Sequence, residues 1–172
     1  PWPRLYAAAE PSWITRNPYA CLVAPGLGFG PLMVVGTHIA VAGRYDTAAG
    51  IAALVPFFLV SALLLLNQFP DVEADREAGR RHLPIVWGRP RAAHVFVALY
   101  ALAYLSLVAG VVVGALPWPC LLGLVTLTLA VPAARDVLRH PDDVKALLPA
   151  MGRNVMVNLA TPAFVAVGLF VG

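Results

Sequence analysis

Long apolar runs alternate along the chain with short segments rich in charged residues, proline or glycine. Five such runs can be marked: Tyr19 to Ala42, Ile51 to Phe69, Ala92 to Ala115, Pro119 to Ala134 and Val155 to Val171. About 20 helical residues, each rising about 1.5 Å, cross the roughly 30 Å hydrocarbon core of a bilayer. The pattern therefore predicts an all-α fold, an integral membrane helical bundle of about five transmembrane helices.

The composition is typical of a protein whose solvent is lipid. Of the 172 residues, 60% are hydrophobic and 12% are charged, and the mean hydropathy is +0.77, whereas ordinary soluble domains are about 45–50% apolar. No tandem repeat or low-complexity linker interrupts the sequence, so we expect residues 1–172 to form one membrane domain. In the first span we expect Gly26, Gly28, Gly30 and Gly36 to permit close helix packing.

The distribution of basic residues predicts an orientation in the membrane. The net charge is +3, but the basic residues lie between the apolar runs without interleaved aromatics, so we expect no nucleic acid partner. Positive residues are retained in the cytoplasm. If the loop 70–91 is cytoplasmic, the alternation of five spans leaves only Arg44 outside. The basic residues then placed inside are Arg4, Arg16, Arg76, Arg80, Arg81, Arg89, Arg91, Arg135, Arg139, Lys145 and Arg153.

Polar residues become dense directly after the apolar run that ends at Leu66. Asn67, Asp71 and Asp75 follow at intervals of four, which would place their side chains on one helix face. Pro70 cannot donate a backbone hydrogen bond, so we expect the helix to kink or restart there, with Asp71 in a fresh first turn. Two aspartates on one face suit Mg²⁺, which takes oxygen ligands and completes its shell with water or substrate phosphate.

Arginines beside these aspartates extend the pattern toward anion binding. Arg76, Arg80 and Arg81 could hold anionic oxygens close to the metal. From spacing alone, a charged loop whose side chains are solvated and pair weakly is an equal alternative, because DxxxD is a short pattern. His82 could also donate to a phosphate, although a loop histidine is more often solvated.

A longer motif surrounds the aspartates and carries a family resemblance. The run NxxxDxxxDxxxGRRxLPxxxG, from Asn67 to Gly88, resembles the second Asp-rich motif of the UbiA superfamily of intramembrane prenyltransferases, in particular its menaquinone-pathway branch. Leu27 to Gly36 is similar to the Gly-rich fifth helix of that family, and Gly88 to Ala93 is similar to the entry of its seventh. Departures from the family pattern are Gln68, Pro70 and His82.

The resemblance implies a fold of nine helices around a central cavity, in which the five spans correspond to helices five to nine. The first Asp-rich motif of the family is then absent, so we expect this chain to be a C-terminal half that requires the missing N-terminal half of the same protein. The membrane implied is the cytoplasmic membrane of a bacterium or archaeon.

The resemblance also implies an activity and a site. Asp71 and Asp75 would be catalytic as Mg²⁺ ligands, and Asn67, Arg76, Arg80 and Arg81 would bind the diphosphate of an isoprenoid substrate. The prenyl group would pass to an aromatic acceptor such as a hydroxynaphthoate or hydroxybenzoate, in quinone or related lipid biosynthesis. The molecules that the protein is then expected to bind are a prenyl diphosphate, the aromatic acceptor and membrane lipid.

Two other classes of membrane protein compete with this interpretation. CDP-alcohol phosphotransferases also use aspartates on membrane helices with a divalent metal, but their DGxxAR signature is missing here. A transporter or a catalytically silent helical scaffold is the alternative outside enzymology. The last three spans carry no paired charges of the kind that a transport relay often requires.

The charge distribution generates a topological prediction. In a variant without Cys21 and Cys120, cysteines introduced as Ala78→Cys and Ala48→Cys should lie on opposite sides of the membrane, with Ala78→Cys inside. A membrane-impermeant thiol reagent applied to intact cells should therefore label only Ala48→Cys. The reverse labelling pattern would show that the predicted orientation is wrong.

Overall fold

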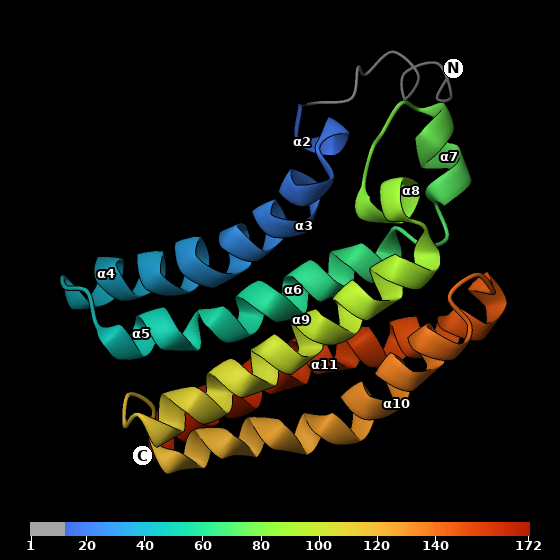
Figure 1. Cartoon of the computed structure of the whole chain (residues 1–172). Helices are drawn as coiled ribbons and strands as arrows, with labels where there is room; N and C mark the ends of the chain where they lie inside the picture. Colours follow the sequence, from blue (N-terminus) through green and yellow to red (C-terminus); the bar gives the residue numbers. More distant parts are fainter. Residues whose placement is uncertain (1–12) are drawn as a thin grey trace, which may run out of the picture.

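The computed structural model describes residues 13–172, and that part of the chain consists of helices joined by short connections, without a strand (Figure 1). Its helices, in chain order, are α2 (Trp13–Arg16), α3 (Pro18–Leu27), the π-helix η1 (Gly28–Val35), α4 (Gly36–Ala42), α5 (Thr47–Ala52), α6 (Leu54–Asn67), α7 (Val72–Glu77), α8 (Leu83–Trp87), α9 (Arg89–Val112), the 3₁₀ segment η2 (Trp118–Thr126), α10 (Leu127–Arg139) and α11 (Val144–Val171).

Several of these helices join end to end, and the result is five helical spans long and apolar enough to cross a membrane. They are Pro18–Ala42, Thr47–Asn67, Arg89–Val112, Trp118–Arg139 and Val144–Val171. The all-α membrane bundle predicted from the apolar runs is confirmed. Arg4, which contributed to the predicted orientation, lies outside the described residues.

The predicted start of the fifth span is wrong, because α11 begins at Val144 and not at Val155. Asp143 caps this helix by accepting hydrogen bonds from the backbone N–H groups of Lys145 and Ala146. Arg153, which seemed to interrupt the apolar run, pairs with Asp136 on α10. The turns of α11 that carry these charges are therefore part of the fifth span and lie at one end of the bundle.

The spans lie side by side, with α6 and α9 near the middle of the bundle (Figure 1). Helix α6 packs against α9, α3 and α11, and α11 also packs along η2 and α10. Fully buried apolar side chains from these helices, among them Leu59, Leu65, Phe96, Leu107 and Val157, form one continuous core. The first span packs chiefly against α6 and exposes large apolar side chains such as Leu32 and Val41.

Two glycines of the first span permit its close approach to α6. A Cβ added to Gly26 would collide with the carbonyl oxygen of Phe57, and one added to Gly30 would lie 2.5 Å from the carbonyl oxygen of Ala53. The packing role predicted for the glycines is confirmed at these two positions. It stays a prediction for Gly28 and Gly36, where an added Cβ would have nothing within 4 Å among the described residues.

Inside the bundle, hydroxyl and amide groups connect three spans. The Tyr100 hydroxyl donates to Asn154 Oδ1 at 2.7 Å, which links α9 to α11. Tyr104 lies within 2.8 Å of the Thr126 hydroxyl, which in turn lies 2.7 Å from the Thr161 hydroxyl. Such bonds satisfy polar groups that have no water available in hydrocarbon and tie neighbouring helices together.

The glycine contacts generate a prediction about stability. Gly26→Val should lower the free energy of unfolding in detergent by about 1–3 kcal/mol, because the new side chain overpacks the contact with α6. Gly28→Val is the matched control in the same span and should change it by no more than about 0.5 kcal/mol. Thermal unfolding of both variants measures the difference, and equal stabilities would contradict the proposed close contact.

Candidate functional site

The motif segment begins where α6 ends. Asn67 is the last residue of α6, Phe69 is fully buried, and α7 starts at Val72 with Asp71 in the N-cap position. The prediction that Asn67, Asp71 and Asp75 share one continuous helix face is therefore wrong. The predicted restart at Pro70 is confirmed, because proline cannot donate the backbone hydrogen bond that would continue α6.

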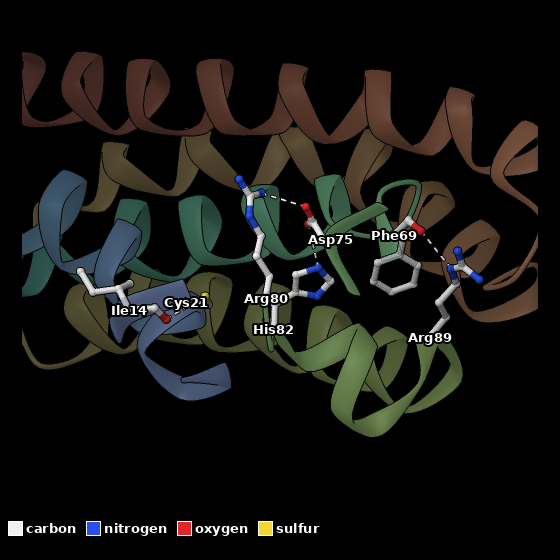
Figure 2. Close-up of polar contacts among 7 residues, drawn as sticks. All are labelled: Ile14, Cys21, Phe69, Asp75, Arg80, His82 and Arg89. Atoms are coloured by element: carbon white, nitrogen blue, oxygen red, sulfur yellow. Dashed lines mark hydrogen bonds and ion pairs between the residues drawn. The ribbon is translucent and has the colours of Figure 1, made fainter. Parts of the chain in front are cut away.

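Arg89 holds the end of α6 in place. Its Nε donates to the carbonyl oxygen of Phe69 at 2.9 Å, as Figure 2 shows. The guanidinium satisfies the carbonyl of a buried residue just beyond α6, and its positive charge is favourable near the negative end of the helix dipole. Because Arg89 is the first residue of α9, this bond connects the start of α9 to the start of the motif segment.

The end of α7 reverses the chain through a left-handed glycine. Gly79 has φ +76°, and its N–H donates to the Arg76 carbonyl, while the Arg80 N–H donates to the Asp75 carbonyl at 2.9 Å. These two bonds form a Schellman motif, in which the residue after the helix adopts the conformation that glycine tolerates best. The turn brings residues 80–82 back alongside α7.

Asp75 is the centre of the polar contacts that this turn creates. Its Oδ1 accepts from Arg80 Nη1 at 2.8 Å, and its Oδ2 lies 2.9 Å from His82 Nε2. Figure 2 shows the carboxylate between these two side chains. The Asp75 side chain is only 13% exposed, whereas that of Arg80 is 48% exposed. The site is therefore a carboxylate held between an exposed cation and a buried ring.

His82 is buried, with 2% of its surface exposed, so the interpretation of this residue as a solvated loop histidine is wrong. Burial lowers the pKa of His82 below its ordinary value of 6.5, and the hydrogen bond and charge of Asp75 oppose that shift only in part. The imidazole is thus neutral at pH 7. Because a carboxylate can only accept, Nε2 carries the proton and donates to Asp75. Nδ1 has no hydrogen-bond partner among the described residues.

The structure brings together some of the predicted site residues and separates others. Arg80 meets Asp75, and Asp71 is exposed at the start of α7, close enough to act electrostatically on His82. Arg76 instead pairs with Glu73 at 2.9 Å on an exposed face of α7. The remaining two residues predicted for the site are Asn67, half-buried at the end of α6, and Arg81, which is exposed and whose backbone N–H donates to Thr15.

Sequence reasoning missed the contact of His82 with Asp75 and the part that Arg89 plays at this site. The sequence signal for the burial of His82 was the apolar pair that follows it. Leu83 and Pro84 are both buried, and His82 is buried beside them. No sequence signal pointed to the contact between Arg89 and Phe69, since the two lie 20 residues apart and meet only through packing of α6 against α9.

The donor set is compatible with Mg²⁺ bound in part by other groups. Within residues 13–172, no group of three or more His, Cys, Asp or Glu side chains is arranged to hold a metal ion. Asp71 and Asp75 supply the hard oxygen ligands that Mg²⁺ prefers, and Mg²⁺ often takes only one or two carboxylates beside water and substrate phosphate. Each Asp75 carboxylate oxygen has one hydrogen-bond partner among the described residues and keeps a further lone pair for a ligand.

Comparisons with known proteins give consistent matches. A family model described as the UbiA prenyltransferase family matches residues 5–152. The 1,4-dihydroxy-2-naphthoate octaprenyltransferase of Mycobacterium tuberculosis (strain ATCC 25618 / H37Rv) is 31% identical over 123 residues, which cover 72% of this chain and 41% of the relative. The enzyme of the same name from Bacillus subtilis (strain 168) is 28% identical over 106 residues, which cover 61% of this chain and 34% of the relative.

An archaeal protein also matches the chain. The digeranylgeranylglyceryl phosphate synthase of Thermococcus onnurineus (strain NA1) is 41% identical over 63 residues, which cover 37% of this chain and 22% of the relative. The chain thus spans less than half the length of these curated relatives. No solved structure matches it significantly.

The turn after α7 generates a testable prediction. Gly79→Ala should destabilise the protein by roughly 1–2 kcal/mol, because a side chain is strained in the left-handed conformation. It should also speed hydrogen exchange at the Arg80 amide, which donates to Asp75. Gly79→Asn is the control, since asparagine tolerates this conformation better. If the alanine variant kept both the stability and the exchange rate, the turn would not depend on glycine.

Proposed function

The chain belongs to the UbiA prenyltransferase family, and from that premise we propose that the protein transfers a prenyl group from an isoprenoid diphosphate to an aromatic acceptor. The acceptor is of the hydroxynaphthoate or hydroxybenzoate class, in quinone or related lipid biosynthesis. Two relatives named 1,4-dihydroxy-2-naphthoate octaprenyltransferase support this choice. The observation that carries the proposal is the Asp75 carboxylate, held beside Arg80 at the end of an apolar helical bundle.

The charged groups at this end of the bundle bind the diphosphate in our proposal. Asp71 and Asp75 would hold Mg²⁺, and the bound ion would supply positive charge to stabilise the leaving diphosphate. Arg80 is half-exposed, so its guanidinium can exchange one carboxylate oxygen for a phosphate oxygen. Asn67, Arg76 and Arg81 lie at the same end of the helical bundle and contribute further hydrogen-bond donors to the anion.

Apolar helix faces receive the prenyl tail and the reacting carbon. An allylic cation would be captured by water, so the protein has to exclude water from the space where the aromatic ring attacks. The spans that leave the site are apolar along their length, with a mean hydropathy of 2.5 in the most apolar window of Thr47–Asn67. This surface suits a polyprenyl chain, because its transfer out of water is favourable in proportion to the apolar area buried.

We propose that the motif segment faces the cytoplasm. The described basic residues other than Arg44 lie in or near the connections at the end of the bundle that carries α2, α7 and α8, except Arg153, which lies inside α11 and pairs with Asp136 on α10. Arg44 lies in the connection between α4 and α5, at the other end (Figure 1). This distribution supports retention of the motif end on the cytoplasmic side of a bacterial or archaeal membrane. The Mg²⁺ and diphosphate would then meet the site from the cytoplasm.

We also propose that a segment outside this chain completes the site. Its helices would correspond to the N-terminal half that the family resemblance implies, with a further Asp-rich motif for the remaining diphosphate charge. Exposed apolar side chains on the first span, such as Leu32 at 72% and Val41 at 84%, are compatible with helices packed against it. Two carboxylates with one metal leave much of the charge of a diphosphate unpaired, which supports the need for more ligands.

Substitution of the aspartates tests the proposed site. In membranes that hold the full-length protein, Asp71→Ala or Asp75→Ala should lower prenyl transfer by about 100-fold or more, because each removes a group that stabilises the leaving diphosphate. Glu73→Ala should be much milder, since Glu73 pairs with Arg76 on the exposed face of α7.

The measurement is transfer of radiolabelled prenyl diphosphate to 1,4-dihydroxy-2-naphthoate and to 4-hydroxybenzoate at saturating Mg²⁺. Comparison of the two acceptors identifies the preferred ring. Equal turnover in the three variants would show that the carboxylates have no part in catalysis. Transfer that is unchanged after chelation of divalent cations would exclude the proposed metal.

A further inference from the structure

We propose that His82 is a positioning residue that orients the Asp75 carboxylate for its ligand. This inference rests on the proposed function, because it assigns to His82 the task of holding a group that binds Mg²⁺ and diphosphate. Its basis is the contact between His82 Nε2 and Asp75 Oδ2 at 2.9 Å.

The two partners of Asp75 differ in how firmly they are held. The side chain of Arg80 is 48% exposed and can move toward an incoming anion, whereas that of His82 is 3% exposed. When a diphosphate draws Arg80 away from Oδ1, the bond from His82 remains as the contact that fixes the rotation of the carboxylate. In this proposal the contact from His82 to the Asp75 carboxylate is permanent, and the contact from Arg80 is exchanged when the anion binds.

The surroundings of His82 keep its ring in place. Leu83 and Pro84 are buried directly after it, and the His82 carbonyl accepts hydrogen bonds from the backbone N–H groups of Ile85 and Val86. Before it, the Arg81 N–H donates to the Thr15 carbonyl of α2 at 2.8 Å. The backbone is thus held on both sides of residue 82, and the imidazole has little freedom to leave Asp75.

The unsatisfied nitrogen of His82 argues against a role in packing alone. Nδ1 is buried and has no hydrogen-bond partner among the described residues, which costs free energy. A leucine would fill a similar space without burying an unpaired nitrogen. Within residues 13–172, the one polar contact of the His82 ring is the bond from Nε2 to Asp75, so that bond is the function we assign.

Three substitutions separate a positioning role from a structural one. His82→Gln can place its amide nitrogen near the position of Nε2, so it retains a donor to Asp75. His82→Asn reaches only the position of Nδ1, and His82→Leu has no donor. His94→Leu is the matched control, because His94 is exposed on α9 and its Nδ1 contacts the carbonyl of Pro90 in the same helix.

The main readout is binding of radiolabelled inorganic pyrophosphate to the full-length protein in detergent, titrated with Mg²⁺. Loss of a bond that orients a metal ligand typically weakens binding about 10–100-fold. His82→Leu and His82→Asn should therefore raise the half-saturating Mg²⁺ concentration by about that factor. His82→Gln and His94→Leu should have a half-saturating Mg²⁺ concentration close to that of the unsubstituted protein. In turnover assays, KM should rise for the prenyl diphosphate and stay constant for the aromatic acceptor.

The outcomes separate this inference from the proposed function. Unchanged Mg²⁺ dependence in His82→Leu, or equal loss in His82→Gln and His82→Asn, would overturn the positioning role and leave the proposed function standing. If His82→Leu does not fold, the glutamine and asparagine variants decide the question between them. If the unsubstituted protein binds pyrophosphate with Mg²⁺ but transfers no prenyl group, the proposed reaction is wrong, and the positioning role is still decided by the binding of the His82 variants. If it binds no pyrophosphate, both are wrong.

Discussion

Hydrocarbon offers no hydrogen-bond partner to a polypeptide backbone, and the rest of this structure depends on that constraint. Each of the five spans satisfies its own N–H and C=O groups as a helix, whatever its neighbours are. Helices then meet closely where a side chain is missing, as at Gly26 against α6 and at Gly168, whose added Cβ would lie 2.5 Å from the backbone of Cys120. Charged chemistry is left to the ends of the spans.

At one of these ends, a few local contacts and turns bring residues of the Asp-rich motif together in space. Burial of Phe69 and the bond from Arg89 hold the end of α6, and Pro70 prevents its continuation. The left-handed Gly79 then reverses the chain after α7. As a result Asp75 meets two residues that follow it in the sequence, and a carboxylate, a guanidinium and an imidazole share one small region.

This arrangement divides the charged residues of the motif into two groups. Arg76 and Glu73 pair on an exposed face of α7, where such a pair contributes little to stability. Asp75 lies largely out of solvent, where hydrogen bonds are stronger and the orientation of a carboxylate is more sharply defined. The same short segment thus provides both a solvated surface and a preorganised group, which is what a site for a charged ligand at a membrane boundary requires.

The sequence by itself determined the membrane class, the five spans and the place of the Asp-rich segment, because apolar length and the restriction at Pro70 are local properties. It did not reveal that α11 extends back to Val144, that His82 is buried, or that Arg89 contacts Phe69. Those features depend on contacts with residues that lie on other helices or on the opposite side of the turn at Gly79. Only tertiary packing decides which partner a polar side chain finds, since a helical periodicity describes one helix and not its neighbours.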